Sequence, residues 1–235
     1  MAVTLSSQAP FARGGNRLCF VDPTDSGRCI KVRRPDFTVA DRRRKKGFPK
    51  TLLPLSRFDD NREERQVMVA LQRRYGEPLY RHVSRCFGFV RTDMGPGLVS
   101  ELIRDDDGGV AQTLKKTLWD EGMTEACRQA VEALAGFWLA MRMPSRDLLL
   151  HNIVVQRAGD GGIRRLVVID GLGSTGLIPM LLLPVALQRG KTQRKVANLH
   201  QRIQALLAQR GQPDFPGYHG LLLHDGRAEA LGRNQ

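Results

Sequence analysis

The sequence predicts an α+β fold with two lobes, because the two halves of the chain carry different patterns. Residues 1–103 read as short strands, in the order three strands, one helix and two strands. Residues 104–235 are mainly helical, with two short apolar strands. The polar stretch Asp105 to Gly109 (DDDGG) separates the halves. We therefore predict an N-terminal lobe over 1–103, a mainly helical C-terminal lobe over 104–235, and a hinge at the polar break.

The expected strands of the first lobe lie at residues 3–5, 17–21, 28–32, 86–91 and 98–103. The turn DPTDSG joins the second strand to the third, and the turn TDMGPG joins the last two, so two hairpins are expected. Asp59 and Asp60 precede a helix-like segment that runs to about Arg74, with acidic residues near its start and arginines near its end, as the helix dipole favours.

Two helices of the second lobe are expected from apolar residues that recur on one helix face. Between them, a polar loop within residues 143–156 leads to a short apolar strand, and a second apolar strand covers 166–169. The recurring positions are Cys127, Val131, Leu134, Trp138 and Met141 in the first helix, and Val196, Leu199, Ile203 and Leu206 in the second.

The composition is that of a globular protein, since 41% of the residues are hydrophobic and can fill a core. The longest apolar run, Leu177 to Leu187, is interrupted by two prolines and is shorter than the ~20 residues of a membrane-spanning helix. The first residues lack the charged and apolar regions of a secretory signal, so a cytoplasmic protein is expected. Four cysteines without a CxxC pair are expected to be reduced, mostly buried thiols.

A net charge of +13 predicts an anionic partner, such as a nucleotide, an acidic sugar, a lipid head group or nucleic acid. The densest charge is Arg42 to Lys46 (RRRKK), which is either a docking surface or, more commonly, a solvated insertion. Aromatic residues make up only 6% of the chain, whereas nucleic-acid binding favours basic residues interleaved with exposed aromatics. Nucleic acid is therefore the disfavoured partner.

The loop after the first long helix carries a pattern typical of phosphoryl transfer. In the stretch SRDLLLHN, Asp147 and Asn152 have the D-x-x-x-x-N spacing of a kinase catalytic loop, and Arg146 precedes the aspartate. Such a loop can present a carboxylate to an attacking hydroxyl and an amide oxygen to a metal ion. Asp170, which ends an apolar strand and is followed by Gly171, suits the second metal-binding position, because carboxylate oxygen is a ligand that magnesium prefers.

The first lobe carries residues suited to hold ATP. Lys31 lies in the third strand, from which an ammonium group can reach the α and β phosphates, and Glu64 in the following helix is its expected partner. Gly14 and Gly15, in the loop FARGGN, could place backbone amides over phosphate. The stretch Glu101 to Ile103 would form the connector whose backbone reads the adenine edge.

Each of these signals has a common structural explanation when it stands alone. A Gly-Gly pair usually makes a hairpin, a strand lysine is usually solvated, Asp and Asn usually form turns and caps, and the pair Glu63 and Glu64 would usually face solvent. Their order along the chain favours a site for ATP and Mg²⁺ in a protein-kinase-like fold. Glu63 stays open as the alternative partner of Lys31.

At these residues the sequence resembles the YrbL family (PhoP regulatory network protein), a bacterial group with a protein-kinase-like fold. The resemblance covers most of the chain, and it is carried by LSSQAPFARGGNRLCFVDPTDSGRCIKV, DLLLHNIVV and IDGLGSTGLIP. It implies a compact bacterial cytoplasmic kinase-like protein with a connection to the PhoP response.

Several departures from ordinary kinases shape the expected function. Leu149 stands where protein serine/threonine kinases commonly have lysine, His151 directly precedes the asparagine, and Gly171 replaces the usual phenylalanine after Asp170. Without an A-P-E sequence there is little room for a peptide-docking platform, so a reduced C-terminal lobe is expected.

The expected activity is transfer of the ATP γ-phosphoryl group to a hydroxyl of an anionic small molecule or glycan. In this hypothesis Asp147 accepts the hydroxyl proton, and Asn152 and Asp170 hold magnesium. Lys31 neutralises phosphate charge while Glu64 positions it. The alternatives are a pseudokinase that senses nucleotide without turnover, and a basic protein that binds nucleic acid.

Overall fold

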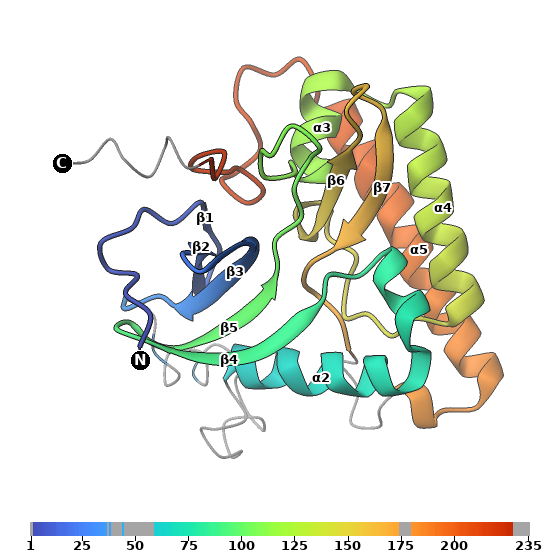
Figure 1. The fold of residues 1–235 in the computed structure, drawn as a ribbon. Helices are drawn as coiled ribbons and strands as arrows, with labels where there is room; N and C mark the ends of the chain where they lie inside the picture. The colour runs from blue at the N-terminus through green and yellow to red at the C-terminus, as the bar shows by residue number, and fades with distance from the viewer. Residues whose placement is uncertain (1, 37, 39–43, 45–58, 174–179, 228–235) are drawn as a thin grey trace. The chain divides into compact units, whose positions relative to one another are not determined.

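The chain forms two units of different construction, and the computed structural model describes residues 2–36, 38, 44, 59–173 and 180–227 of them. The predicted basic tract Arg42 to Lys46 lies outside the described residues apart from Arg44. The first unit consists of Met1–Ala70, Arg85–Leu102 and Leu222–Gln235, and the second of Leu71–Ser84 and Ile103–Leu221. The first is built on a sheet and the second mainly on helices, which confirms the α+β fold class (Figure 1).

The first unit contains a five-stranded antiparallel sheet with the strand order β1-β2-β3-β5-β4. Both predicted hairpins form, as β2–β3 and β4–β5. Residues 3–5 do not form a strand of their own, since Val3 makes only an isolated parallel bridge to Thr92. The strands are β1 (Ala12–Arg13), β2 (Arg17–Asp22), β3 (Asp25–Arg33), β4 (Cys86–Thr92) and β5 (Gly95–Glu101).

The core of this unit forms because apolar side chains of β2, β3 and β5 meet on one side of the sheet. Leu5, Phe20, Ile30, Val32 and Val99 are all buried in one cluster. The central strand β3 is buried on both faces from Cys29 to Val32, so the intervening Lys31 is carried into the interior with its neighbours. The sequence of β3 therefore forces a charged side chain into a buried position.

Helix α2 (Asp60–Tyr75) begins and ends close to the predicted residues. Asp59 accepts backbone hydrogen bonds from Asn61 and Arg62, which satisfies free N–H groups at the helix start. Acidic residues lie in the first turn and basic residues in the last, where they complement the helix dipole. Residues 60–70 belong to the first unit and residues 71–75 to the second.

The second unit packs three helices and a short hairpin. Thr124 caps the predicted long helix by accepting a hydrogen bond from Cys127 N at 3.1 Å, and the predicted apolar faces of both long helices are buried apart from the half-buried Met141. The sequence analysis did not predict the α-helix α3 (Leu114–Glu121). The other elements are α4 (Glu125–Met141), β6 (Ile153–Arg157), β7 (Ile163–Val168) and α5 (Val185–Ala208), with the short 3₁₀ helices η3 (Glu77–Arg81), η4 (Leu150–Asn152) and η5 (Met180–Leu182).

The chain passes from the first unit to the second after Leu102, one residue from the predicted break, and two further segments join the unit that is distant in sequence. The segment 222–227 returns to the first unit, where Leu222 forms an antiparallel bridge with Ala12 and Leu223 N donates to Phe11 O at 2.7 Å. The segment 71–84 belongs to the second unit, because Ser84 N donates to Val168 O at 3.2 Å beside a bridge from Val83 to Val168. Long-range backbone pairing decides both assignments, and it leaves no local mark in the sequence.

Within the described part of the chain, none of the helices combines the length and the apolar character that crossing a membrane requires.

Candidate active site

Lys31 and Glu64 form a buried ion pair in the first unit. Lys31 Nζ lies 2.8 Å from Glu64 Oε1, and the two side chains are 7% and 12% exposed. A buried ammonium group is stable only with a compensating charge, and α2 supplies it one turn beyond its start. The pairing distinguishes Glu64 from the alternative Glu63. It is the geometry that the sequence predicts for a phosphate-binding lysine and its partner.

Arg17, which the sequence analysis did not single out, shares the same carboxylate. Its Nη1 donates to Glu64 Oε2 and, at 3.1 Å, to Asn61 Oδ1. Asn61 Nδ2 in turn donates to Lys31 O at 2.9 Å, so β2, β3 and α2 are joined by one network. Lys31 and Arg17 thus share one carboxylate, which ties both cations to the first turns of α2. Arg17 and Glu64 are 47 residues apart in the chain, so no local sequence pattern predicts their contact.

The glycine pair forms a turn at the edge of the sheet. Gly14 and Gly15 lie between β1 and β2, and neither has a positive φ. Gly14 N donates to Arg17 O at 2.9 Å and closes the turn. The carbonyl oxygens of both glycines accept hydrogen bonds from Arg34 Nη1, at 3.4 and 3.1 Å. The loop is thus fastened to the end of the sheet, and its role toward phosphate stays a prediction.

The predicted adenine connector carries the chain from the first unit into the second. Glu101 ends β5, and its N–H donates to Arg85 O at 2.9 Å, while its carboxylate accepts from Arg85 N at 2.9 Å. Leu102 N donates to Gly27 O, and Ile103 O accepts from Ala111 N at 3.0 Å. These bonds fix the course of the connector. Its part in reading adenine stays a prediction.

The second unit brings Asp147, Asn152 and Asp170 together. An antiparallel bridge joins Ser145 to Leu172, and Arg146 N donates to Gly171 O at 2.8 Å, so the catalytic-loop sequence runs beside the segment that carries Asp170. Asn152 lies at the start of the β6–β7 hairpin, where its carbonyl oxygen accepts from Ile169 N at 2.9 Å. The D-x-x-x-x-N loop and the strand-terminal aspartate, predicted from separate stretches, are therefore neighbours.

Gly171 allows the catalytic loop and the segment after β7 to lie close together. Its φ is +84°, which an L side chain rarely adopts, and a Cβ atom there would lie 2.7 Å from Asp147 O and 3.2 Å from Asn152 Nδ2. The absent phenylalanine of ordinary kinases is thus replaced by a residue that must be small. Gly171 N also donates to Asp170 Oδ1 at 2.6 Å, which orients that carboxylate.

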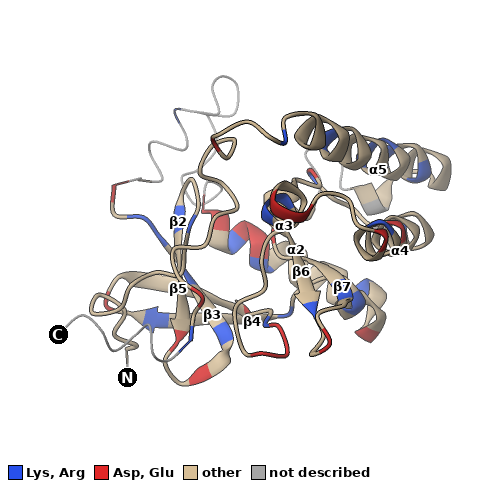
Figure 2. Cartoon of the chain, turned by 90° about the horizontal axis from the view of Figure 1, so that it is seen from above, with Lys and Arg blue, Asp and Glu red and all other residues tan. Residues whose placement is uncertain are grey.

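Arg202 of α5, also missed by the sequence analysis, pairs with the predicted base. Its Nη2 lies 2.7 Å from Asp147 Oδ2. Lys195, seven residues earlier and thus two turns along the same helix, donates to Arg146 O. Figure 2 shows that α5 carries several basic residues.

His151 is neutral around pH 7. Burial, together with the nearby His219, Lys115 and Arg202, lowers its pKa to about 4 against the opposite effect of Asp170. Its ring stacks on that of His219, with centroids 5.1 Å apart. Lys115 holds the segment around His219 in place, because it donates hydrogen bonds to Pro216 O and, at 3.1 Å, to His219 O. The imidazole is thus a packed side chain beside the asparagine.

The residues present suit a magnesium ion that shares its coordination with phosphates. Asn152 and Asp170 offer an amide oxygen and a carboxylate, both of the hard type that magnesium prefers. Across the described ranges there is no cluster of three or more His, Cys, Asp or Glu that could hold a metal by itself. Magnesium in nucleotide sites is commonly held by one or two protein oxygens, with phosphates and waters completing the shell.

Thiol chemistry is not supported near this site. All four cysteines are free, and Cys29 and Cys127 are buried whereas Cys19 and Cys86 are half-buried. Burial raises the pKa of Cys29, which lies two residues from Lys31, to about 12. A thiol that stays protonated is neither a nucleophile nor a metal ligand.

A cavity of about 430 Å³ opens elsewhere on the first unit. It is lined by Arg33, Arg34 and Arg62 together with apolar side chains such as Phe89 and Met94, and neither Lys31 nor Glu64 lines it. Asn61, which binds Lys31 O, and Arg34, which binds the glycine loop, also line it, so the cavity borders on the candidate site without including the ion pair.

The class of protein follows from the order of these parts. A sheet lysine paired with a helix glutamate, followed by a D-x-x-x-x-N loop and a strand-terminal aspartate, defines a protein-kinase-like fold. The chain belongs to the YrbL family, since the family described as "PhoP regulatory network protein YrbL" matches residues 3–204.

Two relatives carry the name "Uncharacterized protein YrbL", one from Escherichia coli (strain K12) and one from Shigella flexneri. Each is 28% identical over 182 residues, which is 76% of this chain and 77% of the relative. Among solved structures, the crystal structure of Rad53 in complex with AMP-PNP is similar with a TM-score of 0.45 and 12% identity. That match covers 71% of this chain and 38% of the Rad53 chain.

Proposed function

We propose that this protein binds ATP with magnesium and transfers the γ-phosphoryl group to a hydroxyl of an anionic small molecule or glycan. The observation that carries the proposal is the convergence of Asp147, Asn152 and Asp170 around Gly171 in the second unit. These are the side chains that phosphoryl transfer needs on one side of the phosphates, namely a carboxylate for the hydroxyl and two oxygen ligands for magnesium.

Each residue of the candidate site has a separate role in the proposed phosphoryl transfer. Asp147 orients the acceptor hydroxyl and takes its proton. The acceptor oxygen bonds to phosphorus as the bond to the bridging oxygen of ATP breaks, and the electron pair leaves with ADP. Asn152 and Asp170 would hold magnesium, which supplies positive charge to the phosphate oxygens when bound. Lys31 neutralises phosphate charge, and Glu64 keeps its ammonium group in place.

A small or glycan acceptor is favoured over a folded protein. The chain passes from Asp170 to η5 at Met180 and then directly to α5 at Val185. An activation segment and peptide platform of the usual kinase type would have to fit into that interval. The net charge of +13 favours an acceptor that is itself anionic, and we place the activity in the cytoplasm, where ATP is abundant.

The test is the variant Asp147→Ala. Wild-type protein with Mg²⁺ and ATP should release ADP in the presence of a panel of phosphorylated sugars and acidic glycans. The variant should lose this activity by at least about a hundredfold, as expected for loss of a general base, while its affinity for Mg·ATP by calorimetry stays within about twofold. Full activity in the variant would exclude Asp147 as the base.

The departures at Leu149 and Gly171 support one rival, a nucleotide sensor without turnover. A sensor would be stabilised by ATP only when magnesium is present, and it would form no product with any acceptor in the panel. Thermal melting and ADP release, measured on the same preparation, separate the two functions.

A further inference from the structure

The contact between Asp147 and Arg202 is a half-satisfied ion pair. Arg202 Nη2 donates to Asp147 Oδ2 at 2.7 Å. Among the described residues, the other terminal nitrogen, Arg202 Nη1, and the other oxygen, Asp147 Oδ1, are buried and have no hydrogen-bond partner. An unpaired buried polar atom destabilises the folded protein, and more so when the group is charged. Such atoms in a folded protein call for a specific explanation, and a ligand that pairs with both is one.

Helix α5 holds Arg202 firmly at this place. Val196, Leu199, Ile203 and Leu206 bury one face of the helix, and Lys195 fastens the helix to the catalytic loop through Arg146 O. The side chains of Arg202 and Asp147 are 32% and 33% exposed, so the pair lies at an edge of the unit, and a small rotation of either side chain brings its buried unpaired atom to a ligand. The helix backbone that carries Arg202 is thus fixed, and a hydrogen bond to Asp147 Oδ2 holds the guanidinium beside the catalytic loop.

The catalytic loop also lacks a positively charged side chain at one position. Leu149 occupies the position where protein serine/threonine kinases commonly carry lysine, two residues after the catalytic aspartate. The charge on a transferring phosphoryl group is normally met by such a cation, and leucine cannot meet it. Arg202 arrives at the same aspartate from α5, 55 residues further along the chain.

We propose that Arg202 is a catalytic residue that binds the γ-phosphoryl group of ATP through Nη1 and takes the place of the missing loop lysine. Nη2 keeps Asp147 oriented, which leaves Oδ1 for the acceptor hydroxyl. A guanidinium suits this double task, because its planar fork can hold a carboxylate and a phosphoryl oxygen at once. The inference rests on the proposed function, and it adds a residue to the site.

Two other roles for Arg202 lead to different results. A purely structural ion pair would change stability without changing the preference for ATP over ADP. A contact that merely blocks Asp147 would give faster turnover when the arginine is removed. The γ-phosphate is present only in ATP, so comparison of the two nucleotides isolates the proposed contact.

The experiment measures Mg·ATP and Mg·ADP affinity by calorimetry and ADP release by a coupled assay, for wild type and for Arg202→Met, Arg202→Lys and Arg194→Met. For Arg202→Met we expect ADP release to fall about 10²–10³-fold, as for loss of one preorganised donor. ATP affinity should fall about tenfold, as for loss of one charged hydrogen bond, and ADP affinity should stay within about twofold. Arg194, exposed on the same helix, is the matched control and should behave as wild type.

Arg202→Lys keeps the charge beside Asp147, so it stays informative if the methionine variant does not fold. A lysine cannot bridge both oxygens as a fork, so we expect intermediate turnover and partial loss of ATP preference. Unchanged ATP preference and turnover in either folded variant overturns the inference, and so does faster turnover.

The outcome for wild type separates this inference from the proposed function. Wild-type protein that binds ATP but never releases ADP would refute transfer, while the ATP-to-ADP affinity ratio would still decide the contact of Arg202. Wild-type protein that binds neither nucleotide would overturn both.

Discussion

Glu64 compensates two cations in the first unit, the buried Lys31 and the partly buried Arg17. One carboxylate therefore determines both the stability of the cluster and the position of the lysine ammonium group. A surface ion pair would contribute little, but here the lysine is almost fully buried and has lost its hydration. Glu64, which the sequence analysis predicted as the partner of Lys31, therefore also stabilises the fold of the first unit.

Replacing Glu64 by glutamine should destabilise the protein by about 3–5 kcal/mol, because it removes the carboxylate that the buried ammonium group of Lys31 and the guanidinium of Arg17 share. Urea unfolding monitored by circular dichroism measures this loss. The matched control is Glu63→Gln, at the neighbouring half-buried position, which should cost no more than about 1 kcal/mol. Equal costs for the two variants would contradict the assigned pairing.

Gly171 is required for two separable reasons, its positive φ and the closeness of Asp147 O. Gly161, in the β6–β7 turn, has a similar φ of +79° but nothing within 4 Å of a Cβ atom, so it shares only the first reason.

Gly161→Ala should therefore cost about 1–2 kcal/mol, the backbone penalty alone. Gly171→Ala should cost more, and it should also lower ADP release, because the new methyl group displaces the backbone of Asp147. Urea unfolding and ADP release on both variants test this. Similar stability and similar activity in the two variants would show that the close approach is unimportant.

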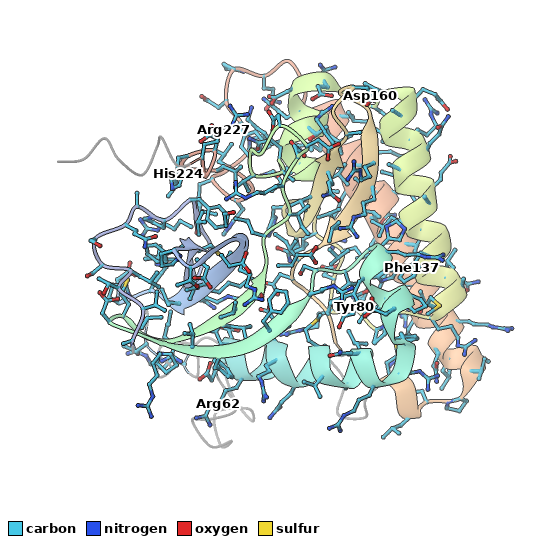
Figure 3. The ribbon with its side chains drawn as sticks, viewed as in Figure 1. Arg62, Tyr80, Phe137, Asp160, His224 and Arg227 are labelled. Atoms are coloured by element: carbon cyan, nitrogen blue, oxygen red, sulfur yellow. The ribbon has the colours of Figure 1, made fainter. Side chains whose placement is uncertain are left out.

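At the scale of elements, His82 joins three parts of the second unit. It follows η3, its Nδ1 lies 2.8 Å from Leu166 O of β7, and its ring lies 5.0 Å from that of Phe137 on α4. Figure 3 labels Phe137 on α4 and Tyr80 on the neighbouring η3. Burial lowers the pKa of His82, the hydrogen bond to Leu166 opposes this, and Arg165 and Arg81 lower it further.

The folded state therefore binds a proton at His82 less readily than the unfolded state does. The stabilisation is fully present above the unfolded pKa of about 6.5, and it is lost as the pH falls below that value. The melting temperature should fall between pH 7.5 and pH 5.5 by more in wild type than in His82→Gln, which cannot titrate. The other histidines are common to both proteins, so the difference isolates His82. Parallel pH profiles would contradict this origin.

Elements with a long or strongly alternating pattern were predictable from the sequence, and short ones were not. The faces of α4 and α5 were visible because their apolar residues recur over several turns, and the strands β2 and β3 because a turn separates them. Helix α3 is only eight residues long, which is too short for a clear period. Its start at Thr113, which caps Lys116 N, was the one available signal.

The residues of the candidate site also fall into those that the sequence predicts and those that it does not. Asp147, Asn152 and Asp170 were found because their spacing is local, and Lys31 because it stands in an apolar strand. Arg17 and Arg202 were missed, since they reach their partners across 47 and 55 residues. Contacts of that separation are set by sheet pairing and helix packing, and a single sequence does not record them.

At the scale of the whole molecule, both units are discontinuous in sequence. The chain passes between them after residues 70, 84, 102 and 221. The last passage was unexpected, because residues 222–227 have no strand pattern of their own. They are held by the edge strand β1, which sits directly before the glycine pair. An edge strand exposes unpaired backbone groups, and here the C-terminal segment pairs with some of them.

Removal of that segment should loosen β1. A chain ending at Leu221 loses the Leu222 bridge to Ala12, the hydrogen bond from Leu223 to Phe11 O, and the contact of His224 with Ala9 O at 3.2 Å (Figure 3). At about 1 kcal/mol for each lost hydrogen bond, the melting temperature should fall by several degrees. Hydrogen exchange should accelerate in peptides covering 9–13 and stay unchanged in α4. A chain ending at Arg227 keeps all three contacts and should match wild type. If both truncations exchange alike at 9–13, the C-terminal segment contributes nothing to the first unit.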